Sequence, residues 1–116
     1  MQELCIQSFL NKKLEKTSRT WIFSGPMTVF KIKEIQDFLK FKKLNQELAG
    51  VQEWILDLKQ VTQIDTAGLA YLLVCIRSSV QDFSCKLSMI YFPEKAERLM
   101  EAQGVTSLFK KFVKNL

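Results

Sequence analysis

One short apolar run does most to limit what this chain can fold into: Trp54–Leu58, WILDL, which lies between polar residues. Such a run is typical of a strand buried in a parallel sheet. After a polar loop, residues 66–81 carry apolar side chains at helical spacing and on several sides, which predicts a covered helix. Residues 86–92 then have the composition of a further strand. This order predicts parallel pairing of the two strands through a right-handed crossover.

The preceding residues predict a hairpin and one more helix. Residues 4–10 and 20–24 are strand-like and are separated by a polar turn. The Gly25–Pro26 pair is predicted to end the second of these strands. Thr28 could then cap a helix over residues 29–43. The apolar stripe of that helix would be Ile32, Ile35, Phe38 and Leu39.

A third helix is predicted after the strand at 86–92. Pro93 suits the first position of a helix, residues 94–103 continue it, and Gly104 suits its end. Together with the preceding segments, this gives the order β-β-α-β-α-β-α. The sequence therefore predicts an α/β fold.

The last residues have the clearest periodicity in the chain. Six apolar residues fall at helical steps: Val105, Leu108, Phe109, Phe112, Val113 and Leu116. Three lysines fall between them: Lys110, Lys111 and Lys114. The pattern predicts a domain over residues 1–109 and a basic amphipathic helical extension over 110–116, with Thr106 as a candidate cap. We expect Leu108, Phe109, Phe112 and Val113 to pack on this domain or on a second copy. A partner groove or a membrane surface are the alternatives.

The composition removes several classes of catalytic site. The 116 residues include no histidine, which excludes Ser-His-Asp and Cys-His nucleophiles and His-ligated zinc sites. There are four glycines and no glycine-rich phosphate loop. We therefore predict a protein that is not an enzyme and that holds no cofactor and no metal. The three cysteines, Cys5, Cys75 and Cys85, form no C-x-x-C pair and are expected to be reduced, buried thiols of a cytosolic protein.

The net charge of +5 is unevenly spread: residues 1–43 and 110–116 are basic, and the residues between them are acidic. We favour solvated lysines on helix faces over a basic surface for an acidic protein, nucleic acid or anionic lipid. No nucleic-acid partner is expected. The longest uncharged apolar stretch, residues 66–76, is too short for a bilayer span, which needs about 20 residues. The first residues also lack the basic region of a signal peptide, so the predicted location is the cytoplasm.

One segment could carry function: Asp65–Leu69, DTAGL, at the start of the apolar helix. The first turn of a helix has up to four backbone N–H groups without partners, and it is the positive end of the helix dipole. A hydroxyl there can cap the helix, bind an anion or carry a phosphate. Asp65 or Thr66 could equally be a simple N-cap. Ala67 and Gly68 leave the backbone bare, which favours close approach by another chain.

Residues 54–73, WILDLKQVTQIDTAGLAYLL, resemble the central signature of the STAS domain. In that signature, a strand ending in Asp-Leu is followed by a short loop and by Asp-[Ser/Thr]-x-Gly-Leu at the start of a helix. Ser24–Gly25 is similar to the end of the family's second strand, and Gly104–Phe109 is similar to its usual ending. The resemblance implies the STAS fold: α/β, with a single mixed β-sheet of about four strands and helices packed against it.

Within this family, residues 56–73 look most like the small cytoplasmic STAS subunits of Mla-type ABC transporters, which move phospholipid between bacterial membranes. The Thr at the position of Thr66 lies at the interface with the ATPase subunit in that group. The resemblance implies a non-catalytic subunit that binds and regulates this ATPase and reaches the inner membrane only through it. The partner-binding residues that it implies are Asp65, Thr66, Ala67, Gly68, Leu69, Leu72, Met27 and Thr28.

Two other functions stay open. Some STAS domains are anti-sigma-factor antagonists, and for these the resemblance implies phosphorylation of Thr66 by an anti-sigma-factor kinase. A weaker alternative is a nucleotide- or lipid-binding module. In the Mla-type subunits and in the anti-sigma-factor antagonists, the second strand usually continues with Gly-Glu-Leu-Asp. Residues 25–28 here read Gly-Pro-Met-Thr, without the two carboxylates, which argues against a phosphoswitch. Lys59 also replaces the usual Ser after Asp-Leu. A homodimer stays open as well.

Overall fold

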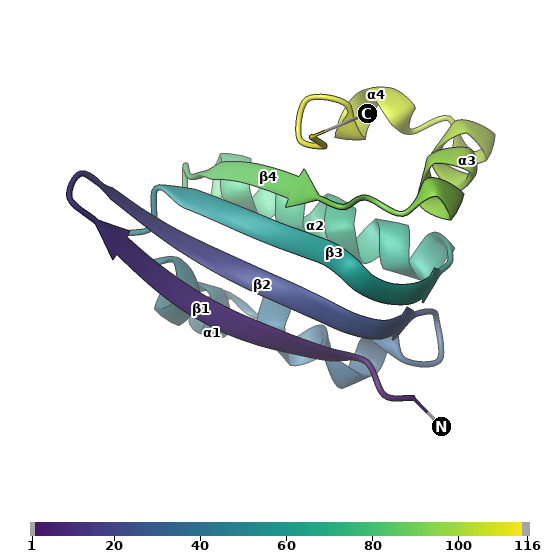
Figure 1. The fold of residues 1–116 in the computed structure, drawn as a ribbon, viewed down its shortest axis with the longest axis horizontal. Coiled ribbons are helices and arrows are strands. Elements are labelled where there is room, and N and C mark those ends of the chain that lie inside the picture. Colours follow the sequence, from purple (N-terminus) through teal and green to yellow (C-terminus); the bar gives the residue numbers. More distant parts are fainter. Residues whose placement is uncertain (1, 115–116) are drawn as a thin grey trace.

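The computed structural model describes residues 2–114, and its four strands form one mixed sheet in the order β1-β2-β3-β4 (Figure 1). The strands are β1 (Cys5–Lys13), β2 (Lys16–Met27), β3 (Glu53–Ile64) and β4 (Lys86–Ile90). β1 and β2 form the predicted antiparallel hairpin, and β3 pairs in parallel with both β2 and β4. The predicted α/β fold with a single mixed sheet is confirmed.

The Gly25–Pro26 pair does not end β2, contrary to the prediction. The pairing of β2 with β3 shifts register between Ile22 and Ser24 and again at this pair, and such irregularities accommodate a proline that cannot donate a hydrogen bond. Gly25 has a φ of +103°, and a Cβ there would collide with the carbonyl oxygen of Glu3. Glycine therefore lets the residues before β1 approach β2, and the strand continues to Met27.

The predicted helix over residues 29–43 is wrong. The segment forms two short 3₁₀ turns, η1 (Ile32–Glu34) and η2 (Gln36–Leu39), and the helix α1 (Phe41–Leu48) begins only after them. Lys40 separates η2 from α1, because its backbone is extended, with φ −66° and ψ 140°. Thr28, the expected cap, therefore precedes a 3₁₀ turn rather than a helix.

The spacing of the apolar side chains explains these turns. Ile32, Ile35 and Phe38 recur every third residue, which matches the three residues per turn of a 3₁₀ helix. Ile35 is fully buried, and the other two pack against the core. Three residues at this spacing can therefore point at the sheet together without an α-helix.

The helices α2 (Thr66–Gln81) and α3 (Glu94–Gln103) form over the residues that the sequence predicts. Gly104 ends α3 with a left-handed backbone, φ +70°. In Figure 1, α1 and α2 lie behind the sheet, and α3 lies beside β4. The core fills the space between the sheet and the helices behind it. At its centre the rings of Trp21 and Trp54 pack edge to face, 4.8 Å between centroids.

The predicted helix over the tail is wrong for residues 110–114, and residues 115 and 116 lie outside the described residues. Helix α4 covers only Thr106–Phe109, and its N-cap is Val105 rather than Thr106. The chain then pairs with the edge of β4: Met89 N–H donates to Phe112 O at 2.7 Å, and Lys114 N–H donates to Met89 O at 3.0 Å. This pairing satisfies groups of the edge strand that a helix would leave free.

The apolar residues of the tail divide between core and surface. Phe109 and Val113 are buried and Phe112 packs against the core, as expected. Leu108 is 54% exposed, so its predicted packing on this domain is wrong. Because the helix stops at Phe109, the stripe does not continue as one face.

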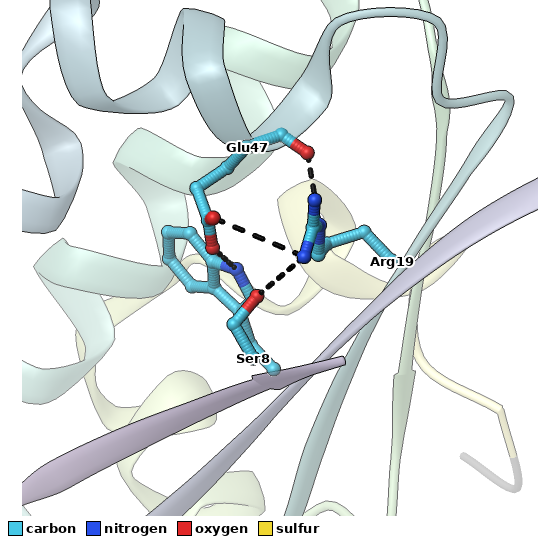
Figure 2. Close-up of polar contacts among 4 residues, drawn as sticks. Ser8, Arg19 and Glu47 are labelled. Atoms are coloured by element: carbon cyan, nitrogen blue, oxygen red, sulfur yellow. Dashed lines mark hydrogen bonds and ion pairs between the residues drawn. The ribbon is translucent and has the colours of Figure 1, made fainter. Parts of the chain in front are cut away.

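A polar cluster ties α1 to the hairpin (Figure 2). Arg19 donates from Nε to Glu47 O at 3.0 Å and from a terminal nitrogen to Ser8 Oγ at 3.2 Å. The Glu47 carboxylate accepts from Trp21 Nε1 at 2.9 Å and lies 3.9 Å from the Arg19 guanidinium. Both charged side chains are mostly buried. The cluster therefore fixes the end of α1 against β1 and β2.

Candidate functional site

Asp65 lies between the end of β3 and the first residue of α2, where it is the N-cap of the helix. Its Oδ1 accepts from Ala67 N–H at 2.9 Å and from Gly68 N–H at 3.2 Å. These are two of the first-turn donors that a helix leaves without partners. The predicted capping role of Asp65 is therefore what its side chain does in the structure.

The same carboxylate also holds the loop that follows β2. Asp65 Oδ2 accepts from Val29 N–H at 2.9 Å, and Asp65 N–H donates to Met27 O at 3.2 Å. Residues 27–29 are thereby fixed beside the start of α2. The sequence separates these two segments widely, so their contact depends on the parallel pairing of β2 with β3.

Thr66 is the exposed residue of this junction. Among the described residues, its hydroxyl makes no hydrogen bond to another protein group. Ala67 beside it is half-buried. The hydroxyl of Thr66 is therefore free to meet a partner or a modifying enzyme.

Gly68 allows close packing within the chain and does not leave its backbone open to a partner. A Cβ at this position would collide with Met27 O and would lie 2.7 Å from Ile64 Cγ1. The bare backbone that was expected to admit another chain is thus occupied by the end of β2 in the same chain. Gly68 is buried, and only glycine fits there.

Three further residues that were expected to bind a partner are core residues. Met27 and Leu72 have no exposed surface, and Leu69 is 2% exposed. They hold α2 against the sheet and offer no surface to a partner in this structure. Of the expected set, Thr28, Asp65, Thr66 and Ala67 retain accessible surface.

Two exposed apolar residues in the loop that Asp65 holds were not predicted as site residues from the sequence. Val29 is 59% exposed and Phe30 is 81% exposed, and the hydrogen bond to Asp65 fixes the backbone of Val29. Next to them is an open depression lined by Gln2, Pro26, Thr28, Phe30, Lys31, Thr62 and Gln63. Phe30 carried a signal, because it does not fit the three-residue spacing of Ile32, Ile35 and Phe38, whereas Val29 does fit that spacing and so gave none.

The cysteines divide into two kinds. Cys75 and Cys85 are buried free thiols, as expected, and burial raises the pKa of both. Cys5 is exposed on β1, contrary to the expectation of burial, because β1 lies at the edge of the sheet. Within residues 2–114, no group of His, Cys, Asp or Glu side chains is arranged to hold a metal, and no helix is long and apolar enough to cross a membrane.

The comparisons with known proteins bear on the family and the fold of the chain. The family model of the STAS domain matches residues 6–116. No curated protein sequence matches the chain significantly.

Three solved structures share the fold at low identity. The phosphorylated form of SpoIIAA, a Bacillus cell fate determinant, is 9% identical, with a TM-score of 0.61 over 95% of this chain and 89% of that chain. The unphosphorylated anti-sigma factor antagonist SpoIIAA is also 9% identical, with a TM-score of 0.58 over the same shares. An uncharacterized DUF3478 protein from Shewanella loihica is 11% identical, with a TM-score of 0.52 over 90% of this chain and 80% of that chain. With the family match spanning nearly all described residues, the chain belongs to the STAS domain family.

Proposed function

We propose that this chain is a non-catalytic regulatory subunit that docks on a partner protein through the start of α2. The docking surface consists of Thr28, Val29, Phe30, Thr66 and Ala67. The observation that supports it most is that Val29 and Phe30 are exposed in the loop that Asp65 holds at the start of α2, where Thr66 is exposed as well. Exposed apolar side chains rimmed by polar groups are characteristic of protein interaction sites.

The partner that we favour is the ATPase subunit of an Mla-like ABC transporter that moves phospholipid between membranes. The support for this choice is the resemblance of residues 56–73 to the STAS subunits of those transporters. The subunit would bind one conformation of the ATPase more tightly than the others, since only such a difference can regulate it. It would then work in the cytoplasm, at the inner membrane through its partner.

A second candidate function is that of an anti-sigma-factor antagonist phosphorylated at Thr66. The exposed hydroxyl, which makes no internal hydrogen bond, favours this alternative because a kinase could reach it. The added phosphate would stand next to the Asp65 carboxylate, which already accepts from Ala67 and Gly68. Repulsion between these charges would alter the docking surface, and phosphorylation would act as an off switch.

The structure gives less support to a nucleotide- or lipid-binding role at this helix end. A bound phosphate would need free N–H donors in the first turn of α2. Asp65 Oδ1 takes those of Ala67 and Gly68, and Asp65 O takes that of Leu69. The helix end is therefore largely satisfied within the chain.

The test is co-purification with the partner, followed by substitutions on the docking surface. An ABC-type ATPase that binds directly when purified supports the transporter role, and a small kinase that phosphorylates Thr66 supports the antagonist role. Thr66→Glu and Phe30→Ser should each abolish binding while the protein stays folded, and Thr66→Ser should bind normally. Leu108→Ser is the matched control, because Leu108 is exposed but lies outside the docking surface. Normal binding by both Thr66→Glu and Phe30→Ser would place the interface elsewhere.

A further inference from the structure

The two edges of the sheet differ. The edge of β4 is paired with the tail through the bridge between Met89 and Val113. β1 pairs with β2 on one side, and no other strand of the described residues pairs with its second side. An edge of this kind presents N–H and C=O groups to any chain that can pair with it.

The central part of β1 lacks the features that usually prevent such pairing. Edge strands are commonly short, bulged, or interrupted by proline or charge. β1 has nine residues and a regular ladder with β2, and no proline or charge occurs between Cys5 and Asn11. Phe9 and Leu10 near its centre are 52% and 45% exposed.

The charges at the two ends of β1 are opposite. Glu3 lies just before the strand, and Lys12 and Lys13 end it. All three side chains belong to exposed residues. A second copy of the same strand, running antiparallel, would bring its basic end to the acidic end of the first. The occupant that this pattern fits is therefore another copy of the chain.

We propose that two copies pair antiparallel through β1, with a twofold axis at Ser8. In this register Glu3 of each copy faces Lys13 of the other, and Ile6 faces Leu10. Phe9 faces Gln7 of the other copy, so the two Phe9 rings are diagonal neighbours, within reach of aromatic contact. The two sheets become one continuous sheet, and the open edge of each is satisfied.

The neighbouring registers are poorer. A shift of two residues in one direction places Glu3 opposite Glu15 of the other copy, and like charges that face each other are destabilising. A shift of two residues in the other direction places Glu3 opposite Asn11 and leaves no facing pair of opposite charges. The charges therefore select the axis at Ser8.

The exposed thiol of Cys5 allows a direct test, because the proposed register places it opposite Asn11 of the other copy. Facing residues of antiparallel strands have Cα atoms about 4.5–5.5 Å apart, which suits a disulfide. Within one copy these positions lie about 20 Å apart on the same strand, so a disulfide between them must join two copies. Cys75 and Cys85 are buried and do not compete.

Asn11→Cys should form a covalent dimer under mild oxidation of the full chain. Phe9→Cys and Lys13→Cys are the matched controls, since each reports a register shifted by two residues. A cross-link at residue 9 or 13 that exceeds the one at residue 11 would contradict the register. Absence of a cross-link in all three would overturn pairing through this edge.

A charge exchange tests the same register without cysteine. Glu3→Lys or Lys13→Glu alone should weaken dimerisation about tenfold in sedimentation equilibrium, and the double exchange should restore it. Lys42→Glu, at an exposed lysine of α1, should leave it unchanged. A chain that stays monomeric from micromolar to millimolar concentration would overturn the proposal. None of these variants changes the docking surface, so the result is independent of partner binding.

Discussion

Both carboxylate oxygens of Asp65 accept hydrogen bonds within the chain. The polar side chain that stays available at the start of α2 is therefore that of the exposed Thr66. One oxygen caps α2 and the other holds Val29. The carboxylate thus positions the docking surface without facing a partner itself. Sequence reasoning could recognise the cap from residue type, but the bond to Val29 joins segments that only the sheet brings together.

Replacing Asp65 with Ala should lower the free energy of unfolding by about 2 kcal/mol, since the loss of an N-cap alone costs about 1 kcal/mol and the loop loses a further bond. Asp65→Asn should cost less, because an amide oxygen can still accept from the first turn. Asp82→Ala, at the other end of α2, should have little effect. Urea unfolding measures all three, and equal values for Asp65→Ala and Asp82→Ala would contradict the structural role of Asp65.

Gly68→Ala should destabilise the protein even though Ala favours a helix by about 1 kcal/mol over Gly. Its Cβ would collide with Met27 O, which belongs to the backbone of β2 and cannot rotate away. Overpacking of this kind typically costs about 1–3 kcal/mol. Thr66→Ala, in the same turn but exposed, is the control in the same urea titration. An increase in stability for Gly68→Ala would show that β2 can move away from α2.

At the scale of elements, the sequence predicted α2 and α3 well and the segment from residue 29 to the start of α1 poorly. In α2 and α3, periodicity agrees with end signals such as Asp65 and Gly104. The stripe from Ile32 to Phe38 has a spacing that both an α-helix and a 3₁₀ turn can satisfy over one or two turns. Packing against the sheet decides between them, and a single sequence does not contain that contact.

The predicted helix over residues 110–114 was wrong for a related reason. Its spacing is helical, but the free edge of β4 offers pairing that the sequence pattern does not reveal. The buried side chains were nevertheless identified correctly at Phe109 and Val113. The sequence therefore predicts which side chains are buried more reliably than it predicts the backbone conformation of the segment that carries them.

Deleting residues 110–116 should lower the melting temperature of the isolated protein by about 5–10 °C. The deletion exposes the edge of β4 and removes the buried Val113, a combined loss of about 2 kcal/mol. Lys111→Ala, which changes an exposed lysine of the same segment, should melt like the unaltered protein. Unchanged melting of the truncated chain together with weaker partner binding would assign the tail to the partner instead.

At the scale of the whole molecule, a single core stabilises the fold. Because this core contains a tyrosine hydroxyl and a cysteine thiol, the stability of the protein should fall at high pH. Tyr71 and Cys75 are both buried in it, and burial raises the pKa of each above its ordinary value. The unfolded chain therefore loses these protons at a lower pH than the folded chain. The resulting stability is complete below the ordinary pKa of 9.0 for Cys75 and of 10.0 for Tyr71, and it declines as pH rises above them.

Each of these groups should reduce the free energy of unfolding by about 1.4 kcal/mol per pH unit once the unfolded chain is ionised. Tyr71→Phe should flatten this decline above pH 10.0. It should also lower stability at neutral pH, because the hydroxyl donates to Ile35 O at 2.9 Å. Tyr91→Phe provides the matched control, since Tyr91 is 55% exposed and its removal should not change the slope. Urea titrations from pH 8 to pH 11 measure both variants. Equal slopes for Tyr71→Phe and Tyr91→Phe would mean that the core opens to water before Tyr71 ionises.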